Sequence, residues 1–243
     1  MRFDEKHEPQ CFEELIFADA TARSICERYV KNKPYKSLLL WGEPGTAKTT
    51  TARVIMKERL AQNGYHDDFE ELNGAGFKVD KMAETMTNLA STLRYSAGEA
   101  ILIINELDGL DRNEQAKFRA FMDKFKFISF IATTNEKPGV FGMKQLLMPA
   151  LLSRFEVVEL AQPKPEDCYL RAQEIFAREG HAVTEASLKV LLANFTGDIR
   201  ELLPAIEAAL EQLNAQNTTT SVTQNSETQS HLKVVSSNSS IQK

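Results

Sequence analysis

Residues 42–49 read Gly-Glu-Pro-Gly-Thr-Ala-Lys-Thr and stand between a short apolar run and a helical pattern. This context is typical of a phosphate-binding loop, in which backbone N–H groups and the positive end of the following helix surround a triphosphate. Lys48 is predicted to reach the β and γ phosphates, and the hydroxyl of Thr49 to bind Mg²⁺. Ala47 stands where the pattern has its second glycine, so a positive φ there would be costly. We therefore expect ATP to be bound by Gly42, Glu43, Pro44, Gly45, Thr46, Ala47, Lys48, Thr49 and Thr50.

A second segment suited to chemistry is the apolar run Ile101–Ile104, which is followed by Asn105 and Glu106. The carboxyl ends of such strands are where open α/β sheets bind ligands. Glu106 has the carboxylate needed to orient and polarise an attacking water molecule. Asn105, the second predicted metal residue beside Thr49, stands where an aspartate is expected. Its neutral amide is a weaker ligand, so we expect slow hydrolysis that the substitution Asn105→Asp accelerates. The alternative is a core strand that ends in an ordinary polar loop.

The elements that would position these residues are short apolar runs that alternate with helical patterns. Buried strands alternating with helices predict a mostly parallel sheet covered by helices on both faces. The fold class is therefore α/β, with a phosphate-binding loop after the first strand. The expected strands are Ser37–Trp41, Phe69–Leu72, Ala100–Ile104, Phe127–Ala132 and Val157–Leu160, and the helices between them include Thr49–Gln62, Val79–Leu93 and Asp111–Phe125.

The last of these helices carries aromatic side chains that could either stack on bases or fill the core. Their i, i+3, i+4, i+7 spacing follows one helix face, which indicates a core stripe. Asp111 and Glu114 have the spacing of a capping box at the start of the helix. The stripe consists of Phe118, Phe121, Met122 and Phe125.

The composition changes twice along the chain, at Pro163 and Pro165 and again after residue 213. Between these points three helical patterns predict a small all-helical lid. From residue 214 on, 20 of 30 residues are Ser, Thr, Asn or Gln, so little apolar surface could be buried to offset the ordering of this segment. A disordered tail is expected there, with an interaction peptide around residues 232–235 as the alternative. The predicted domains are 1–161 for nucleotide binding, 162–213 for the lid and 214–243 for the tail, with lid helices at Glu166–Arg178, Glu185–Asn194 and Asp198–Leu213.

The charge balance limits the partners that this chain can bind alone. Its 29 Lys and Arg against 34 Asp and Glu give a net charge of −5, which argues against a broad basic face for nucleic acid. Contact with nucleic acid must then be local or shared among subunits. Three cysteines without metal-like spacing indicate reduced thiols. No run approaches the ~20 apolar residues of a membrane helix and no secretory signal is recognisable, so we expect a cytoplasmic protein without a membrane partner.

Together, the phosphate loop and the acidic strand end resemble those of AAA+ ATPases, and more closely the ATPase subunits of sliding-clamp loaders. The likeness runs from about residue 5 to residue 213 and is greatest to the loaders of T-even-type bacteriophages. The segments that carry it are Glu5–Pro9 for the E-K-Y-R-P box, Phe69–Gly74 for the second strand, Leu89–Ser91 and Gln115–Asp123 for the phage loaders, Ile131–Asn135 for sensor 1, Ser153–Phe155 for the S-R-C motif and Gly197–Arg200 for sensor 2.

The resemblance implies catalytic roles for four residues outside the phosphate loop. Glu106 and Asn135 would act on the lytic water or the γ-phosphate, and Arg200 would sense that phosphate from the lid. Arg154 would reach the nucleotide of a neighbouring subunit as an arginine finger in trans, worth ~10³-fold or more in rate. The implied cofactors are ATP and Mg²⁺.

The same resemblance implies that the chain works with other clamp-loader subunits in an oligomeric ring or spiral. ATP binding would order the subunits around primer-template DNA and open a sliding clamp, and hydrolysis would release the clamp. If the chain is phage-encoded, this would take place in the host cytoplasm.

The sequence departs from the loader pattern at several places. His7 and Glu8 differ from the box, and the interval Asn135–Ser153 is long, with an inserted loop expected at residues 139–142. We expect no counterpart of the helical collar domain that follows the lid in loader subunits. This expectation and Asn105 favour one alternative, a nucleotide-binding structural subunit that does not hydrolyse ATP. The other alternative is a different DNA-associated AAA+ protein, such as a helicase loader.

Overall fold

The computed structural model describes residues 1–32, 36–62, 70–76, 78–80, 83, 87, 100–126, 128–139 and 147–215. In this part of the chain, five strands form one parallel sheet with the order β2-β3-β4-β1-β5. The predicted parallel α/β sheet is therefore confirmed. The strands are β1 (Ser37–Trp41), β2 (Glu70–Asn73), β3 (Ala100–Asn105), β4 (Ile128–Thr134) and β5 (Phe155–Glu159).

Some strand ends differ from the boundaries expected from the sequence, and the strand pairing explains why. β5 begins two residues earlier than expected, because Phe155 lies opposite Ser37 in the parallel ladder. Leu160, expected to end this strand, instead lies beyond it and donates its N–H to the carbonyl oxygen of Trp41 at 2.8 Å. β4 continues as far as Thr134, because that residue lies opposite Trp41.

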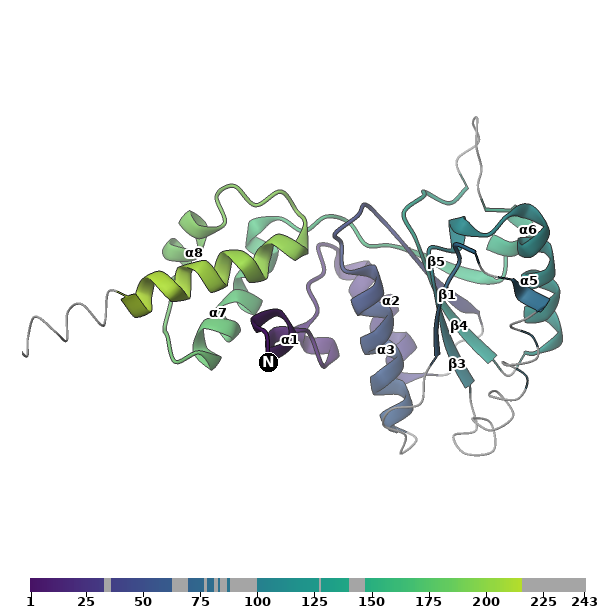
Figure 1. The fold of residues 1–243 in the computed structure, drawn as a ribbon, viewed down its shortest axis with the longest axis horizontal. Helices are drawn as coiled ribbons and strands as arrows, with labels where there is room; N and C mark the ends of the chain where they lie inside the picture. Colours follow the sequence, from purple (N-terminus) through teal and green to yellow (C-terminus); the bar gives the residue numbers. More distant parts are fainter. Residues whose placement is uncertain are drawn as a thin grey trace, which may run out of the picture.

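Helices cover both faces of the sheet (Figure 1). One face carries α2 (Ala20–Lys31) and α3 (Lys48–Gln62), and the other carries α5 (Arg112–Lys124) and α6 (Pro149–Leu152). α6 is a single turn that begins at Pro149, a residue whose fixed φ suits the first helical position. The sheet is thereby buried on both faces, as its near-continuous apolar strands require.

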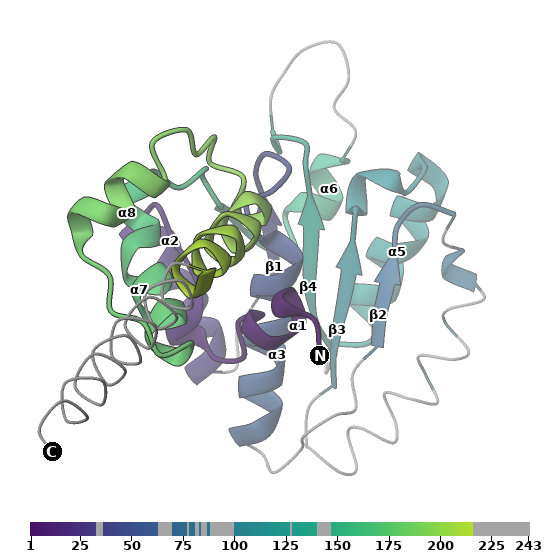
Figure 2. The same ribbon diagram turned by 60° about the vertical axis from the view of Figure 1, so that its left-hand side comes forward.

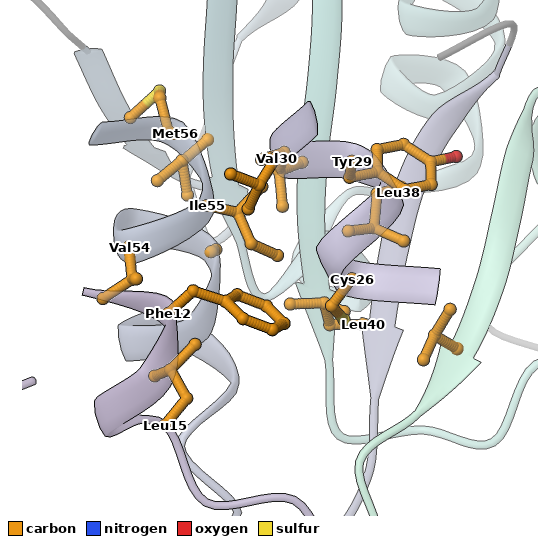
Figure 3. Packing of buried hydrophobic residues seen from close by; sticks show 14 of the residues in the cluster. Phe12, Leu15, Cys26, Tyr29, Val30, Leu38, Leu40, Val54, Ile55 and Met56 are labelled. Atoms are coloured by element: carbon orange, nitrogen blue, oxygen red, sulfur yellow. The ribbon is translucent and has the colours of Figure 1, made fainter. Parts of the chain in front are cut away.

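The two hydrophobic cores of this part follow from the alternation of side chains along the strands. Leu38 and Leu40 of β1 lie in the core against α2 and α3, and Leu39 lies in the core against α5. Figure 3 shows the first of these cores, where Phe12 and Cys26 join Leu40. The N-terminal end of the chain therefore contributes to the core of the sheet.

No pattern in the sequence analysis predicts α2, because its buried face has helical spacing but little apolar bulk. Asp19 caps this helix, and its carboxylate accepts the N–H of Ala22 at 2.9 Å. The buried residues are Ala22, Cys26, Tyr29 and Val30.

α5 confirms the predicted core stripe and corrects the predicted capping box. Asp111 accepts the N–H of Glu114 at 2.9 Å, as a capping residue does. The carboxylate of Glu114 does not return to Asp111, however, and accepts the N–H of Val79 at 2.7 Å. Only half of the box forms, because the side chain of Glu114 satisfies a buried N–H of a neighbouring segment. The buried members of the stripe are Phe118, Phe121 and Met122, while Phe125 is partly buried.

After β5 the chain forms a helical portion with a core of its own (Figure 2). Its helix α8 (Glu185–Leu191) ends three residues earlier than the helix expected at Glu185–Asn194. The last expected helix starts as a tight turn, because the carboxylate of Asp198 accepts the N–H of Arg200 at 2.9 Å. The predicted domain boundaries themselves stay predictions. The elements are η3 (Pro165–Cys168), α7 (Tyr169–Arg178), α8 (Glu185–Leu191), η4 (Ile199–Glu201) and a helix described over residues 202–215.

Residues 1–16, which we name the N-terminal strap, connect the helical portion to the sheet. The strap contains α1 (Phe3–His7) and η1 (Phe12–Glu14). α1 lies against the helical portion in both views (Figures 1 and 2), and Phe3 packs on the core of that portion. Phe12 lies in the core against α2 and α3. The strap therefore contacts both parts of the molecule.

Several predicted segments lie wholly or partly outside the described residues. They are most of the helix 79–93, most of the loop 139–142, residues Phe69, Phe127 and Leu89–Ser91, and the tail from residue 216 on. Among the helices that are described, none is long and apolar enough to cross a membrane. The three cysteines are free thiols.

Candidate nucleotide-binding site

The phosphate loop joins β1 to Lys48, the first residue of α3, and two of its glycines have neighbours that leave no room for a side chain. A Cβ on Gly42 would lie 2.3 Å from the carbonyl oxygen of Leu160. A Cβ on Gly45, which has φ +84°, would lie 2.2 Å from the carboxylate of Asp198. Leu160 leads into the helical portion and Asp198 belongs to it, so the helical portion closes one side of the phosphate loop.

Ala47 has φ +59°, in the left-handed region that costs a non-glycine residue about 1–2 kcal/mol. The structure therefore shows the positive φ that is costly for an alanine. The surrounding loop fixes it: the carbonyl of Ala47 accepts the N–H of Thr51 at 2.8 Å, and the hydroxyl of Thr46 donates to the carbonyl of Glu43 at 3.0 Å. Strained residues of this kind persist where their surroundings determine the backbone, and they cluster at functional sites.

Lys48 holds its ammonium group inside the loop. Its Nζ donates to the carbonyl oxygens of Gly42 at 2.9 Å and Glu43 at 2.8 Å. Burial lowers the pKa of Lys48, and the nearby charges of Glu43 and Asp108 oppose this effect. Because hydrogen bonds between two charged groups are stronger than bonds to neutral carbonyls, phosphate oxygens could replace both present acceptors.

Thr49 and Asn105 meet where α3 begins and β3 ends. The hydroxyl of Thr49 donates to Oδ1 of Asn105 at 3.1 Å, and the hydroxyl of Thr133 on β4 donates to the same atom at 3.1 Å. Mg²⁺ prefers oxygen ligands, and these side chains supply a hydroxyl and a carbonyl oxygen at one point. The structure thus brings the two predicted metal residues together, and their donor atoms fit Mg²⁺.

The amide of Asn105 is bound to a carboxylate that no motif singles out. Its Nδ2 donates to Oε1 of Glu71. Arg53 of α3 holds the same carboxylate, with Nε 2.7 Å from Oε2 and Nη2 2.8 Å from Oε1, and this contact raises the pKa of Arg53. Glu71 pairs with Ile103 in the ladder, two residues before Asn105, so the two side chains share one face of the sheet. Only the strand pairing reveals this neighbour.

Glu106 and Asn135 follow two neighbouring parallel strands, β3 and β4, so they lie at the same edge of the sheet. Glu106 has φ 53° and ψ 53°, a left-handed conformation that turns the chain sharply at the end of β3. Its N–H donates to the hydroxyl of Thr133 at 3.2 Å, and the residue is exposed. Asn135 is exposed directly after β4. Both residues therefore stand at the edge that carries the phosphate loop.

The segment Gly197–Arg200 lies directly on the phosphate loop, where Ile199 donates its N–H to the carbonyl of Gly45 at 2.9 Å. Arg200 pairs with Asp198, with Nη2 2.5 Å from Oδ2 and Nε 2.9 Å from Oδ1. This pair lowers the pKa of Asp198 and raises that of Arg200. The predicted sensor thus stands beside the loop, with its guanidinium bound within its own segment and the side chain 70% exposed.

A cavity of about 350 Å³ lies beside the phosphate loop, between the strap and the helical portion. Its walls combine apolar side chains with four acidic and two basic ones, which suits a ligand with both an apolar and a polar part. Part of the cavity lining comes from sequence motifs: the phosphate loop, residues of the segment Glu5–Pro9, and Arg200. The apolar wall comes from segments that only the fold brings together. The lining includes Glu5, His7, Glu8, Pro9, Leu15 and Ile16 of the strap, Gly45, Ala47 and Thr50 of the loop and its helix, and Ile175, Arg200 and Leu203 of the helical portion.

Arg154 lies at the opposite edge of the sheet from the phosphate loop. Its carbonyl accepts the N–H of Ser37 at the start of β1, whereas the loop follows Trp41 at the end of that strand. At ~3.3 Å per residue, the strand separates the two by roughly 15 Å. Asp123 holds the guanidinium of Arg154 through bonds of 3.1 and 2.8 Å, which raise the pKa of Arg154. The structure therefore does not bring Arg154 to the phosphate loop of its own chain.

A buried ion pair fastens the strap to the helical portion. Nη2 of Arg171 on α7 donates to Oε2 of Glu14 at 3.2 Å and to the carbonyl of His7 at 3.0 Å. The side chains of Arg171 and Glu14 are only 5% and 9% exposed. Arg178, 47% exposed, binds the other oxygen of Glu14. Burial raises the pKa of Glu14, but hydrogen bonds from the N–H of Gln10 and from Arg178 outweigh it, so the net pKa is lowered.

Comparison with known proteins gives a family for this arrangement. Residues 38–162, about half of the chain, match the family described as "ATPase family associated with various cellular activities (AAA)". The replication factor C small subunit of Archaeoglobus fulgidus is 27% identical over 208 residues, which are 84% of this chain and 62% of that protein. The sliding-clamp-loader large subunit of Enterobacteria phage T4 is 30% identical over 203 residues, which are 78% of this chain and 58% of that protein. The chain spans about three fifths of the length of these relatives.

Solved structures show the same fold at lower identity. Domain III of the replication initiation protein DnaA from Thermotoga maritima superimposes with a TM-score of 0.62 at 18% identity, over 86% of this chain and 90% of that one. A RuvB mutant of the same organism gives a TM-score of 0.65 at 18% identity, over 87% of this chain and 68% of that one. Because residues 1–161 are only about two thirds of the chain, this likeness extends into the helical portion.

Proposed function

Because the chain belongs to the AAA family of ATPases, we propose that it is an ATP-binding and ATP-hydrolysing subunit of a DNA sliding-clamp loader. One observation carries the proposal: Lys48, the oxygen pair of Thr49 and Asn105, and the exposed Glu106 meet at one edge of the sheet. The similarity to a phage clamp-loader subunit and an archaeal replication factor C subunit supports this activity over others of the family.

In the proposed complex the phosphate loop, residues 42–50, holds the triphosphate through its backbone N–H groups and the positive end of α3. Lys48 exchanges the carbonyls of Gly42 and Glu43 for the β and γ phosphate oxygens. Thr49 and Asn105 hold Mg²⁺, which supplies positive charge against the phosphates. The cavity under the helical portion accommodates the rest of the nucleotide.

The groups around the γ-phosphate come from three different elements. Glu106 orients and polarises the attacking water, and Asn135 hydrogen-bonds the water or the γ-phosphate from the next strand. Arg200 leaves Asp198 and binds the γ-phosphate bidentately, an exchange that is easy because the present ion pair is exposed. In this proposal residues 1–161 bind the nucleotide and residues 162–213 form a lid that responds to it.

Arg154 completes the site of a neighbouring subunit in this proposal. Its distance from its own phosphate loop supports a role in trans, and Asp123 holds its guanidinium until the neighbour docks. The proposed partners are other loader subunits in a ring or spiral, a sliding clamp and primer-template DNA. With a net charge of −5, the chain would share its contacts to DNA with these subunits.

Two substitutions test the proposal separately. Lys48→Ala should weaken ATP binding at least tenfold, about 1.4 kcal/mol, in a titration of the isolated chain. Arg154→Ala should leave that affinity unchanged and lower the ATP turnover of the assembly with clamp and primer-template DNA by ~10³-fold. Unchanged affinity in Lys48→Ala would exclude the phosphate-loop assignment. If Arg154→Ala lowered the ATP turnover of the dilute, isolated chain by the same factor, a role in trans would be excluded.

The neutral side chain of Asn105 favours a second candidate, a nucleotide-binding subunit that does not hydrolyse ATP. Turnover measured beside ATP affinity, with clamp and DNA present, separates the two functions. Tight binding without turnover, unchanged by Glu106→Gln, would support the second candidate.

A further inference from the structure

Asn105 belongs to a pair of side chains in which the other member, Glu71, carries the charge. We infer that Glu71 is a positioning residue, which turns the carbonyl oxygen of Asn105 toward Thr49, and that the two side chains together replace the single aspartate expected at this place. The inference rests on the proposed function, because it concerns how the chain holds Mg²⁺ and ATP.

The amide of Asn105 has two possible orientations, and Glu71 permits only one of them. An ionised carboxylate can only accept hydrogen bonds, so it receives the NH₂ group and not the carbonyl oxygen. The carbonyl oxygen then faces the hydroxyls of Thr49 and Thr133, each 3.1 Å away. Glu71 thereby determines that an oxygen atom stands beside Thr49.

Arg53 fixes the carboxylate of Glu71 in the plane that this contact needs. Its Nε and Nη2 donate to Oε2 and Oε1 at 2.7 and 2.8 Å, the parallel arrangement that gives arginine–carboxylate pairs their directional strength. Oε1 also accepts the amide of Asn105. Both oxygens of Glu71 are therefore used, and the side chain is 23% exposed.

An alanine in place of Glu71 would release the amide of Asn105. Oε1 of Glu71 accepts from both Arg53 and Asn105, so a glutamine could keep both bonds with its carbonyl oxygen, whereas an alanine keeps neither. Arg53, which has only donors, would then take the carbonyl oxygen of Asn105 in place of the lost carboxylate, and the NH₂ group would turn toward Thr49. An NH₂ group cannot bind a cation, so the Mg²⁺-dependent part of the nucleotide affinity would be lost.

Changing both residues restores the oxygen beside Thr49. In the double variant Glu71→Ala with Asn105→Asp, both ends of the new side chain are oxygens, so one can accept from Arg53 while the other faces Thr49. Asn105→Asp alone instead brings two carboxylates into contact, which is destabilising. The gain in turnover expected from the sequence for Asn105→Asp should therefore appear only when Glu71 is changed with it.

The test uses the full chain with five sequences: the parent, Glu71→Ala, Asn105→Asp, the double variant, and Glu211→Ala as a control at an exposed carboxylate. ATP affinity is measured with excess Mg²⁺ and again with EDTA. Glu71→Ala should weaken the affinity in Mg²⁺ by about tenfold or more and leave the affinity in EDTA unchanged. The affinity of the double variant should return to within about threefold of the parent, and that of the control should equal the parent's.

The thermal midpoints of the same five proteins without nucleotide give a readout that needs no ATP. Both single variants should melt below the parent, and the double variant should recover part of the loss. Parental Mg²⁺ dependence in Glu71→Ala, or a double variant no better than the worse single variant, would overturn the inference. If the parent did not bind ATP, the proposed function would fail, and the thermal midpoints would still decide whether the two side chains act as a pair.

Discussion

Two regions border the cavity beside the phosphate loop, and they are held in place by different means. At the phosphate loop and the sheet edge, Gly45, Ala47 and Glu106 have positive φ, so the backbone conformation itself sets the geometry. At the junction of the strap and the helical portion, the ion pair between Glu14 and Arg171 sets it. A strained backbone fits one arrangement only, whereas side-chain pairs can form and break as rigid parts move. The comparison indicates a loop that keeps its shape and a lid whose position depends on its contacts.

The largest expected effect is at the junction, where Arg171→Ala would leave the carboxylate of Glu14 buried without its buried partner. We expect the free energy of unfolding to fall by about 3 kcal/mol, because the buried bonds of Arg171 to Glu14 and to the carbonyl of His7 are lost, while Arg178 and the N–H of Gln10 still hold the carboxylate. Urea unfolding followed by the fluorescence of Trp41, the single tryptophan, measures this. Arg178→Ala is the matched control: its side chain is 47% exposed, so its loss should cost at most about 1 kcal/mol. Equal effects of the two substitutions would show that burial of the pair is not what holds the strap.

A smaller effect is expected where the two regions touch, at Gly45. Gly45→Ala should cost about 2 kcal/mol, because φ +84° strains an alanine and its Cβ would overlap the carboxylate of Asp198. Gly180→Ala separates these causes, since Gly180 has φ +82° with no atom within 4 Å of the added Cβ. Its cost in the same urea unfolding should be about 1 kcal/mol, from the backbone alone. If both substitutions cost the same, the helical portion does not press on the loop.

The pH dependence of stability sharpens the comparison, because the junction contains a carboxylate with a lowered pKa. A group of this kind stabilises the fold above its ordinary pKa, and this contribution is lost as the pH falls through the lowered folded value. The stability difference between the parent and Glu14→Gln should thus be constant near neutral pH and shrink below about pH 4. Urea unfolding at a series of pH values checks this. A difference that persists unchanged into strong acid would mean that the charge of Glu14 is not what stabilises the junction.

The smallest effect is expected in the backbone-determined region. Ala47→Gly should raise stability by about 0.5–1 kcal/mol, because relief of the strain at φ +59° exceeds the entropy that glycine adds to the unfolded chain. The thermal midpoint measures this gain. Ala186→Gly, at an exposed position of α8, should have the opposite sign, because glycine weakens a helix. A loss of stability in Ala47→Gly would show that the loop does not hold this residue under strain.

The features that could be predicted from the sequence depend on residues that are neighbours along the chain. Ser37–Trp41 is a strand with the expected bounds, since a run of apolar residues before a Gly/Pro turn is a local signal. The stripe on α5 is equally local, because helical spacing places Phe118 and Phe121 on one face. The phosphate loop belongs to this class too, since its residues are consecutive.

The rest required tertiary structure, and the polar network at Asn105 shows why. Arg53, Glu71 and Asn105 come from α3, β2 and β3, and their contacts depend on which strands pair and in which register. The apolar wall of the cavity, with Leu15 and Ile175, likewise joins the strap to the helical portion. No spacing along the chain encodes such contacts.

The helical portion touches the phosphate loop at two points, so a motion of the loop can rotate it as a lever. The chain leaves the sheet at Leu160, whose carbonyl lies against Gly42, and returns at Ile199, which is hydrogen-bonded to Gly45. Gly42 is then the pivot and Gly45 the point where force is applied, and the two are three residues, at most ~10 Å, apart. The helix at residues 202–215 continues for ~20 Å beyond. A displacement of about 1 Å at Gly45, ~10 Å from the pivot, would thus move the far end of that helix, ~30 Å from the pivot, by ~3 Å, so the helical portion amplifies the motion at the loop about threefold.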